Sequence, residues 1–230
     1  MAVLAYGGDM SDLPPPNFIY MPPSLLRPIA GIGKALSFFM FLASGLAVGC
    51  AVTSFHRWQV VKDVKVGVIG STSSQVAHAD DLVSTWSGFL GMAGLVVFIL
   101  LIRWTHRNAL NMRDMGTPTR GSTAMAIWGF FIPLANAVIP YRYFKDIAAW
   151  LAYRGFSPSR YALLPVWWFI YLAGIVTLYT AGSTDYVDNP TIDDLARAEM
   201  WGALAMIVIA FALAIGGIVI RNMTQDASAV

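Results

Sequence analysis

Four long apolar segments constrain the fold of this chain more than any other feature of its sequence. They run over residues 29–52, 82–102, 163–181 and 200–220. Each is close to the roughly 20 residues that an α-helix needs to cross the hydrocarbon core of a bilayer. The overall composition agrees, because only 12% of the residues are charged, against about 25% in a typical soluble domain. We therefore expect four transmembrane helices.

A fifth apolar segment, residues 123–140, is interrupted by Pro133, Asn136 and Pro140. Proline inside a helix removes a backbone donor and clashes with the preceding turn. In lipid the freed backbone groups need partners in the protein or in a wet cavity. The segment is either a short fifth span or a re-entrant segment that enters the membrane and returns on the same side. The predicted fold is an all-α integral membrane protein in both cases.

The distribution of basic residues favours the re-entrant topology, since Lys and Arg are enriched in cytoplasmic loops. With four spans, 11 of the 15 Lys and Arg residues but 5 of the 13 acidic residues lie on the side of the N-terminus. With five spans, 7 basic residues lie on that side and 8 on the other. We therefore expect a cytoplasmic N-terminus and four spans plus the re-entrant segment.

The polar segments complete the expected organisation. Residues 1–24 form a proline-rich N-terminal tail, residues 25–222 the membrane domain, and residues 223–230 a C-terminal tail. We interpret residues 53–84 as a polar connection, with a possible short strand at 64–69.

Two local patterns predict details of the helices. Residues 141–154 are amphipathic, which predicts a helix lying in the membrane interface and ending at Gly155. Its apolar face carries Tyr143, Ile147, Trp150 and Leu151, and its polar face carries Arg142, Lys145, Asp146 and Tyr153. Thr191 and Asp194 resemble a capping box, with Asp in place of the usual Glu.

Small residues at helical spacing indicate close contacts between helices. In the first span Gly45 and Gly49 form a GxxxG motif, and in the last span Ala210, Ala214 and Gly217 form a stripe. Gly88, Gly91 and Gly94 line one side of the second span.

The sequence contains no recognisable catalytic motif: neither a metalloprotease nor a hydrolase nor a phosphate-binding signature occurs. The single cysteine, Cys50, excludes an internal disulfide and a cysteine-based metal cluster. The three histidines are widely separated, and we expect no haem, no metal and no other cofactor. A net charge of +2 without a basic run argues against nucleic acid. We interpret the chain as a protein that is not an enzyme.

The middle of the chain resembles a family of bacterial, mostly actinobacterial, membrane proteins, domain of unknown function 4328. The resemblance covers about residues 95–180. It rests on Arg103–Asn108, Trp128, the Phe-Ile-Pro sequence at 131–133, Asn136, Pro140, the pair Lys145 and Asp146, and Trp167 and Trp168. Asp146 departs from the longer acidic residue that the family pattern leads us to expect. The resemblance implies a multi-pass protein of the bacterial plasma membrane and implies no activity.

Eight residues are our candidates for a structural or functional core: Arg103, Arg107, Asn108, Trp128, Pro133, Asn136, Pro140 and Asp146. We expect Arg103 or Arg107 to reach Asp146. Asn136 is a polar residue at membrane depth, which is costly and often functional. It can equally serve the structure by bonding backbone groups that the prolines leave unpaired.

Two functions follow as hypotheses. The first is a non-catalytic membrane subunit or scaffold that packs against a larger membrane complex and contacts lipid and other membrane subunits. The alternative is a small oligomeric transporter or channel-like protein built around the broken helix at 128–140.

Overall fold

The computed structural model describes residues 26–70, 72–117, 121–183 and 191–229. Within these residues all regular structure is helical. The elements are α1 (Ala30–Lys65), α2 (Ser74–Asp114), α3 (Met125–Trp128), α4 (Pro133–Tyr153), the 3-10 helix η4 (Pro158–Tyr161), α5 (Leu164–Ser183) and α6 (Ile192–Ser228). The all-α prediction is confirmed, and the expected tail at residues 1–24 lies outside the described residues.

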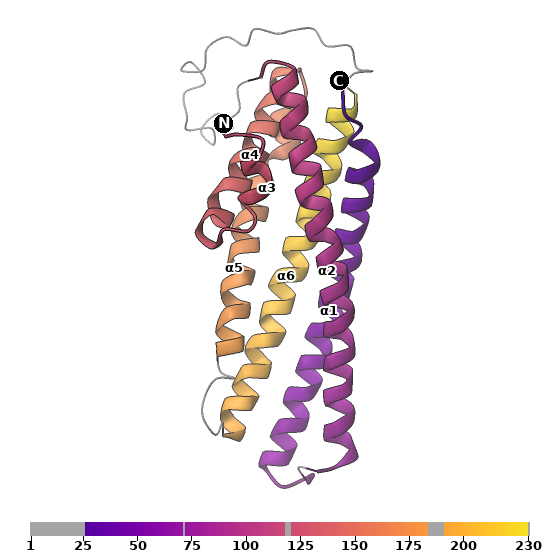
Figure 1. The fold of residues 1–230 in the computed structure, drawn as a ribbon. Coiled ribbons are helices and arrows are strands. Elements are labelled where there is room, and N and C mark those ends of the chain that lie inside the picture. The colour runs from indigo at the N-terminus through magenta and orange to yellow at the C-terminus, as the bar shows by residue number, and fades with distance from the viewer. Residues whose placement is uncertain (1–25, 71, 118–120, 184–190, 230) are drawn as a thin grey trace.

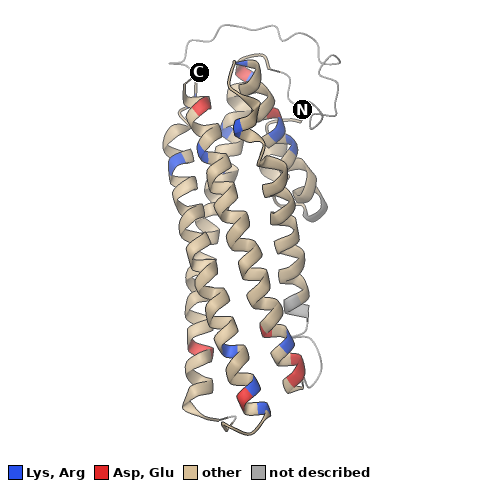
Figure 2. Ribbon diagram, turned by 180° about the vertical axis from the view of Figure 1, so that it is seen from behind, with Lys and Arg blue, Asp and Glu red and all other residues tan. Residues whose placement is uncertain are grey.

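Four helical stretches are long and apolar enough to cross a membrane: α1, α2, α6 and Pro158–Thr180, which includes most of α5 (Leu164–Ser183). α1, α2 and α6 have 36, 41 and 37 residues, which corresponds to about 54–62 Å at 1.5 Å per residue. They therefore extend beyond a hydrocarbon core of about 30 Å. Charged residues gather towards the two ends of the helices and leave a belt between them without charge (Figure 2).

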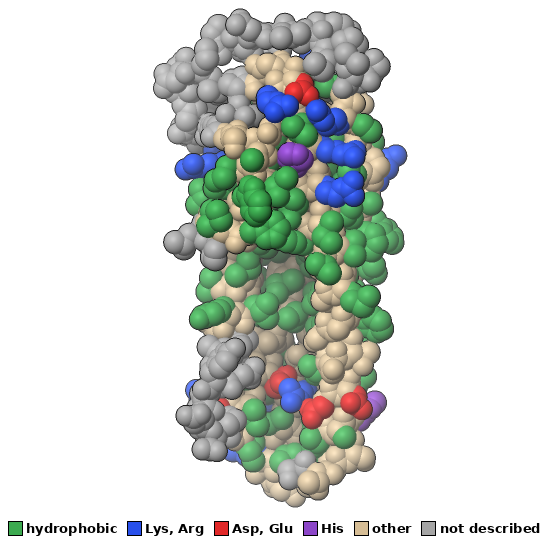
Figure 3. Space-filling view, viewed as in Figure 1, with side chains coloured by type: hydrophobic (Ala, Val, Ile, Leu, Met, Phe, Trp, Pro, Cys, Tyr) green, Lys and Arg blue, Asp and Glu red, His purple; other side chains and the backbone are tan. Residues whose placement is uncertain are grey.

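The long helices are arranged in the order α2, α1, α6, α5, because α1 packs against α2 and α6, and α6 packs against α5 (Figure 1). The hairpin of α3 and α4 lies near one end of the long helices, where it contacts α2, α5 and α6. Below the hairpin the surface is hollowed between α6 and α2 (Figure 3).

The segments before and after the hairpin lie at the same end of the four long helices. Arg27, just before α1, bonds to Asn111 near the end of α2, and Tyr161, just before α5, bonds to Asp226 near the end of α6. This end carries ten Lys and Arg against three Asp among the described residues, and we call it the basic end. The opposite end carries four basic against six acidic residues, and we call it the acidic end.

The hydrophobic core is concentrated towards the basic end, where the hairpin fills the space between the long helices. The inner face of α4 contributes Phe144, Ile147 and Leu151, each fully buried. Phe144 contacts the rings of Trp104, Trp167 and Trp168, with centroids 5.1–6.3 Å apart. Truncation of such a buried aromatic side chain typically costs about 3–5 kcal/mol, so this cluster holds the hairpin against the row.

α4 confirms the predicted amphipathic pattern but not the predicted break at Pro140. The helix continues through Pro140 and starts at Pro133, which follows Ile132 in an extended conformation. A residue before proline avoids the helical region, and proline suits the first turn of a helix. The interruption therefore lies between α3 and α4, and Gly155, with φ of 95°, follows the end of α4 as predicted.

The connections between the long helices are shorter than we predicted. α1 continues to Lys65 and α2 begins at Ser74, so most of the expected polar connection at 53–84 is helix and no strand forms at 64–69. The expected C-terminal tail is also helical, since α6 continues to Ser228. The polar side chains in these extensions bond to neighbouring elements: Arg57 to Asp80, Lys65 to Asp193, and Asp226 to Tyr161. The capping box of Thr191 and Asp194 is present as predicted.

Candidate functional site

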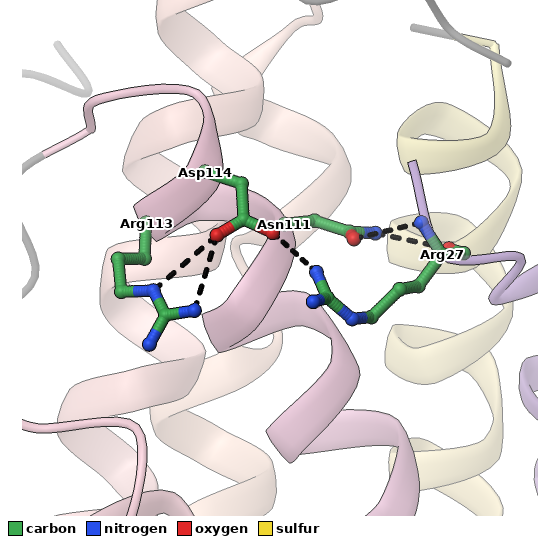
Figure 4. Close-up of polar contacts among 4 residues, drawn as sticks. All are labelled: Arg27, Asn111, Arg113 and Asp114. Atoms are coloured by element: carbon green, nitrogen blue, oxygen red, sulfur yellow. Dashed lines mark hydrogen bonds and ion pairs between the residues drawn. The ribbon is translucent and has the colours of Figure 1, made fainter. Parts of the chain in front are cut away.

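The densest polar contacts lie at the basic end, where the chain before α1 meets the last turns of α2. Asn111 Nδ2 donates to the Arg27 carbonyl, and the Arg27 amide N–H donates to Asn111 Oδ1, both at 3.0 Å (Figure 4). The Arg27 guanidinium pairs with Asp114, which also accepts from Arg113. Arg107 donates to the Pro28 carbonyl at 2.7 Å. We call Arg107, Asn111 and Asp114 the α2 clamp.

The α2 clamp follows from helical spacing, because residues four and three apart share one face. Asn111 is only 5% exposed. Its side-chain amide pairs with the backbone N–H and C=O of Arg27, which lies outside any helix. Buried backbone groups that lack a partner are costly. The clamp therefore fixes the position at which the chain begins α1.

The ion pairs change the titration of Asp114. The hydrogen bond from Arg27, followed by the contact with Arg113, lowers the pKa of Asp114 below its ordinary value, and partial burial opposes this only in part. The carboxylate is therefore charged at neutral pH and contributes to stability in that form.

The three α2 candidates from the sequence have different surroundings. Arg103 is exposed, and Asn108 is 1% exposed with its amide donating to the Trp104 carbonyl of its own helix. Arg107 bonds to Pro28 rather than to Asp146, because the chain before α1 lies against this face of α2. Trp104, which we did not single out, donates its indole N–H to Thr224 at 3.0 Å and joins α2 to α6.

The turn of the α3–α4 hairpin is apolar and lies against the membrane-spanning part of α2. Phe98 of α2 meets the rings of Phe130 and Phe131 edge to face, at centroid distances of 6.1 and 5.6 Å. Trp128, at the end of α3, is 60% exposed and lies 6.0 Å from Phe131. A band of hydrophobic side chains occupies this level of the surface, below the basic side chains (Figure 3).

Asn136 does not have the hydrogen-bonding role that we expected from its sequence position. Pro140 has no N–H to offer to the turn before it, and the indole of Trp168 donates to the Ala137 carbonyl in that turn at 2.8 Å. Asn136 Oδ1 is buried beside α5 and accepts no hydrogen bond from the described residues. Trp168 of α5 therefore bonds to the Ala137 carbonyl, next to the Asn136 carbonyl that has no helical donor at Pro140.

Asp146 lies on the outer face of α4, next to the turn that carries Tyr143. Burial, and then the negative charge of Asp146, raises the pKa of the Tyr143 hydroxyl. That hydroxyl donates to the Ser122 carbonyl at 2.5 Å. Tyr143 is thus a neutral donor that holds the segment before α3 against α4.

A second buried polar cluster joins η4 to α6. Asp226 is 3% exposed and accepts from the Tyr161 hydroxyl at 2.6 Å, while Arg160 Nε lies 3.2 Å from the same carboxylate oxygen. Asn222 donates to the Arg160 carbonyl at 3.3 Å. A buried carboxylate needs a charged and hydrogen-bonding partner, and Arg160 and Tyr161 provide both.

At the acidic end a single arginine joins three helices. Arg57 of α1 pairs with Asp80 of α2 at 2.7 Å and with Glu199 of α6. Lys65 pairs with Asp193 near the start of α6. These contacts join the parts of α1 and α2 that extend beyond the apolar segments to each other and to α6.

The small residues that we assigned to helix packing differ in their surroundings. A Cβ at Gly49 would lie 2.2 Å from the Trp86 ring, and one at Gly217 would lie 3.0 Å from Phe41. Ala210 is buried, and its carbonyl accepts from Ser44 at 2.8 Å, while Ala214 is partly buried. Gly45, however, is exposed, and a Cβ there would meet nothing within 4 Å among the described residues.

The polar side chains of this site join helices and neighbouring segments to one another. Within the described part of the chain, no group of three or more His, Cys, Asp or Glu residues could hold a metal ion. His106 bonds to the Thr123 carbonyl at 3.0 Å. At the basic end, hydrogen bonds join α2 to the chain before α1 and to α6, and join α4 to the segment before α3.

Sequence reasoning missed Arg27, Asn111, Asp114, Tyr161 and Asp226. Part of the signal was present, since Asn111 and Asp114 continue the helical face of Arg107. The partners of these residues, however, lie 84, 87 and 65 positions away in the sequence, and no local pattern identifies them.

Taken together, the fold and these contacts define a multi-pass all-α membrane protein with four long apolar helices. The chain belongs to the family described as Domain of unknown function (DUF4328), whose family model matches residues 69–225. This match confirms the resemblance and extends from just before α2 almost to the end of α6. No curated protein and no solved structure matches the chain.

Proposed function

We propose that this chain is a non-catalytic subunit of a larger membrane complex, which it joins through one side of α2. The observation that carries the proposal is the open surroundings of Gly88, Gly91 and Gly94: a Cβ at any of them would meet nothing within 4 Å. α2 lies at the edge of the row of long helices, and α1 is its neighbour there (Figure 1).

Glycine is the informative residue on this surface. Exposed Phe or Leu in a membrane helix indicates little, because lipid tails are as apolar as these side chains. Glycine costs about 1 kcal/mol of helix propensity relative to alanine and offers lipid no side chain to contact. Glycines three residues apart on an exposed side let a second helix approach closely. A partner helix is therefore the occupant that this side of α2 fits.

We place the basic end in the cytoplasm of a bacterium, which puts the start of α1 and the end of α6 inside. The excess of Lys and Arg at this end supports the orientation. Single cysteines at exposed positions in a Cys50→Ser background test it. Thr72→Cys should react with a membrane-impermeant thiol reagent in intact cells, and Ser157→Cys only after permeabilisation. The reverse pattern would overturn the orientation.

The turn of the α3–α4 hairpin then forms a re-entrant segment. This turn contacts Phe98 of α2. Phe98 lies five positions before Arg103, which is about 7 Å along α2 towards the membrane centre. The exposed side chains of Trp128 and Phe131 are apolar, which suits the outer part of the hydrocarbon core. Labelling of both Thr72→Cys and Ser157→Cys from outside would contradict this arrangement, because the segment would then cross the membrane.

The docking side of α2 is tested by purifying the tagged chain from native membranes in a mild detergent. The parent should retain a membrane partner in stoichiometric amount. Gly91→Leu should melt like the parent, because its space is open, but should lose the partner. Gly202→Leu is the matched control, since Gly202 of α6 also has nothing within 4 Å, and it should retain the partner. Retention by Gly91→Leu, or a parent without a partner, would refute the proposal.

The alternative, an oligomeric transporter, is favoured by one observation, the buried Asn136 Oδ1 without a hydrogen-bond partner among the described residues. A polar group at membrane depth often marks an ion or substrate path. This function predicts a homo-oligomer whose ion flux in vesicles decreases in Asn136→Leu. A hetero-complex without flux supports the subunit instead.

A further inference from the structure

A groove of about 430 Å³ lies at the basic end between the first turns of α1 and the last turns of α6. Lys34 and Arg221 line it, together with Thr224 and Gln225 on the α6 side and Phe38 and Phe41 on the α1 side. The groove therefore combines two cations with aromatic walls.

The close approach of the two helices places the cations at the same level. A Cβ on Gly33 would lie 2.1 Å from Thr224 Oγ1, so α1 and α6 are in direct contact there. Lys34 follows Gly33, and Arg221 lies one turn before Thr224. Both are exposed, and their positions are fixed by rigid helices rather than by loops.

None of the described residues that line this groove is acidic. Among the described residues neither Lys34 nor Arg221 has an ion pair, and the nearby acids are already engaged: Asp114 with Arg27, and Asp226 with Arg160. A second groove, at the acidic end, differs in this respect, because its charged lining residues Arg57 and Asp80 neutralise each other. The α1–α6 groove thus retains an uncompensated positive charge.

The polar and apolar parts of the groove are ordered along the membrane normal. Lys34 and Arg221 stand at the boundary of the apolar stretches of their helices, where lipid headgroups lie. Phe38 and Phe41 follow one and two turns deeper along α1, and they are 62% and 39% exposed. A molecule that fits this order has an anionic head and an apolar chain.

We propose that the α1–α6 groove binds one anionic phospholipid, with its phosphate between Lys34 and Arg221 and an acyl chain along Phe38 and Phe41. Basic pockets between transmembrane helices recognise such headgroups. A soluble phosphate would use the two cations but not the aromatic wall. The site is independent of the α2 surface and of any partner docked there.

The test compares lipid retention by native mass spectrometry and thermal melting of the full chain in a neutral detergent. The parent should retain phosphatidylglycerol in preference to phosphatidylcholine with the same acyl chains, and phosphatidylglycerol should raise the melting temperature more. The double variant with Lys34→Gln and Arg221→Gln should lose on the order of 30-fold in this preference, roughly 5-fold for each cation.

Two controls separate a specific site from general surface charge. Arg142→Gln removes an exposed cation of α4 at the same end and should behave like the parent. The charge-conserving pair Lys34→Arg and Arg221→Lys should retain the lipid.

Equal retention of the two lipids by the parent would overturn the proposal without any variant. Unchanged preference in the double Gln variant would overturn it as well. Displacement of the lipid by inorganic phosphate at equal concentration would also count against a lipid site, since the aromatic wall would then contribute nothing.

Discussion

The Trp86 ring of α2 packs directly against the backbone of α1 at Gly49. A Cβ at this position would lie 2.2 Å from one ring carbon and 2.3 Å from the next. Gly45, one turn earlier in the same GxxxG motif, has nothing within 4 Å. One motif therefore contains a glycine that the fold requires and a glycine that the fold leaves open.

These two glycines predict opposite effects of the same substitution. Gly49→Ala should destabilise the chain by about 1–3 kcal/mol, because the new methyl group overlaps the Trp86 ring and forces α1 and α2 apart. Gly45→Ala should be neutral or stabilising, since alanine favours the helix by up to about 1 kcal/mol. Thermal melting of both variants in detergent measures the difference, and equal melting temperatures would contradict the contact.

The paired hydrogen bonds between Asn111 and Arg27 predict that Asn111→Leu is destabilising although leucine is more apolar. The substitution leaves the Arg27 N–H and C=O without their partner, at about 1–3 kcal/mol for each group that stays buried. Asn111→Asp, which keeps the acceptor and loses the donor, should have an intermediate effect. Limited proteolysis near residue 27 should become faster in the same order. Resistance of Asn111→Leu equal to that of the parent would show that the clamp does not hold this segment.

The lowered pKa of Asp114 predicts a pH dependence of the clamp. A carboxyl group whose pKa is depressed on folding stabilises the folded chain above its unfolded pKa, near 3.8, and loses this effect as pH falls through its folded pKa. At pH 7 Asp114→Asn should therefore melt below the parent, by an amount that corresponds to about 0.2–1 kcal/mol for a partly exposed ion pair. The difference should persist down to about pH 5 and shrink below pH 4. A difference that stays constant down to pH 3 would assign the effect to packing instead.

The four long helices were predictable because hydrophobic length is a local property. A stretch without charge of about 20 residues can be recognised from the sequence alone, and the capping box at Thr191 depends on residues three positions apart. The helix ends at Lys65 and Ser74 were missed, although the start of α2 does have a local signal, since Ser73 accepts from the Val76 N–H. The ion pairs of Arg57 with Asp80 and Glu199 join helices far apart in the sequence, and no local pattern identifies them.

The surroundings of single side chains depend on how each helix is rotated about its axis. Residues four apart are displaced by about 40° around a helix, so Gly45 and Gly49 look equivalent in the sequence. The crossing of α1 and α2 nevertheless brings only Gly49 against Trp86. Likewise, Pro140 correctly indicated a carbonyl without its helical donor, that of Asn136, but the sequence could not show that Trp168 of α5 donates to the neighbouring Ala137 carbonyl.

Trp168 and Trp150 allow the hydrogen bond to the α4 backbone to be measured against an internal control. Both indoles are nearly fully buried, at 6% and 4% exposure. Trp168 Nε1 donates to the Ala137 carbonyl, whereas Trp150 Nε1 has no partner among the described residues. Trp168→Phe and Trp150→Phe remove the same atoms, although the Trp168 ring also contacts other aromatic rings, those of Tyr141, Phe144, Trp167 and Tyr171. Trp168→Phe also leaves a carbonyl near Pro140 without its second donor, and it should be the more destabilising by about 0.5–1.5 kcal/mol. Adding Pro140→Ala should leave this difference unchanged, because an alanine N–H at this position would bond to the Asn136 carbonyl rather than to the Ala137 carbonyl. Equal stabilities of the two Phe variants would show that Trp168 supports α4 through packing alone.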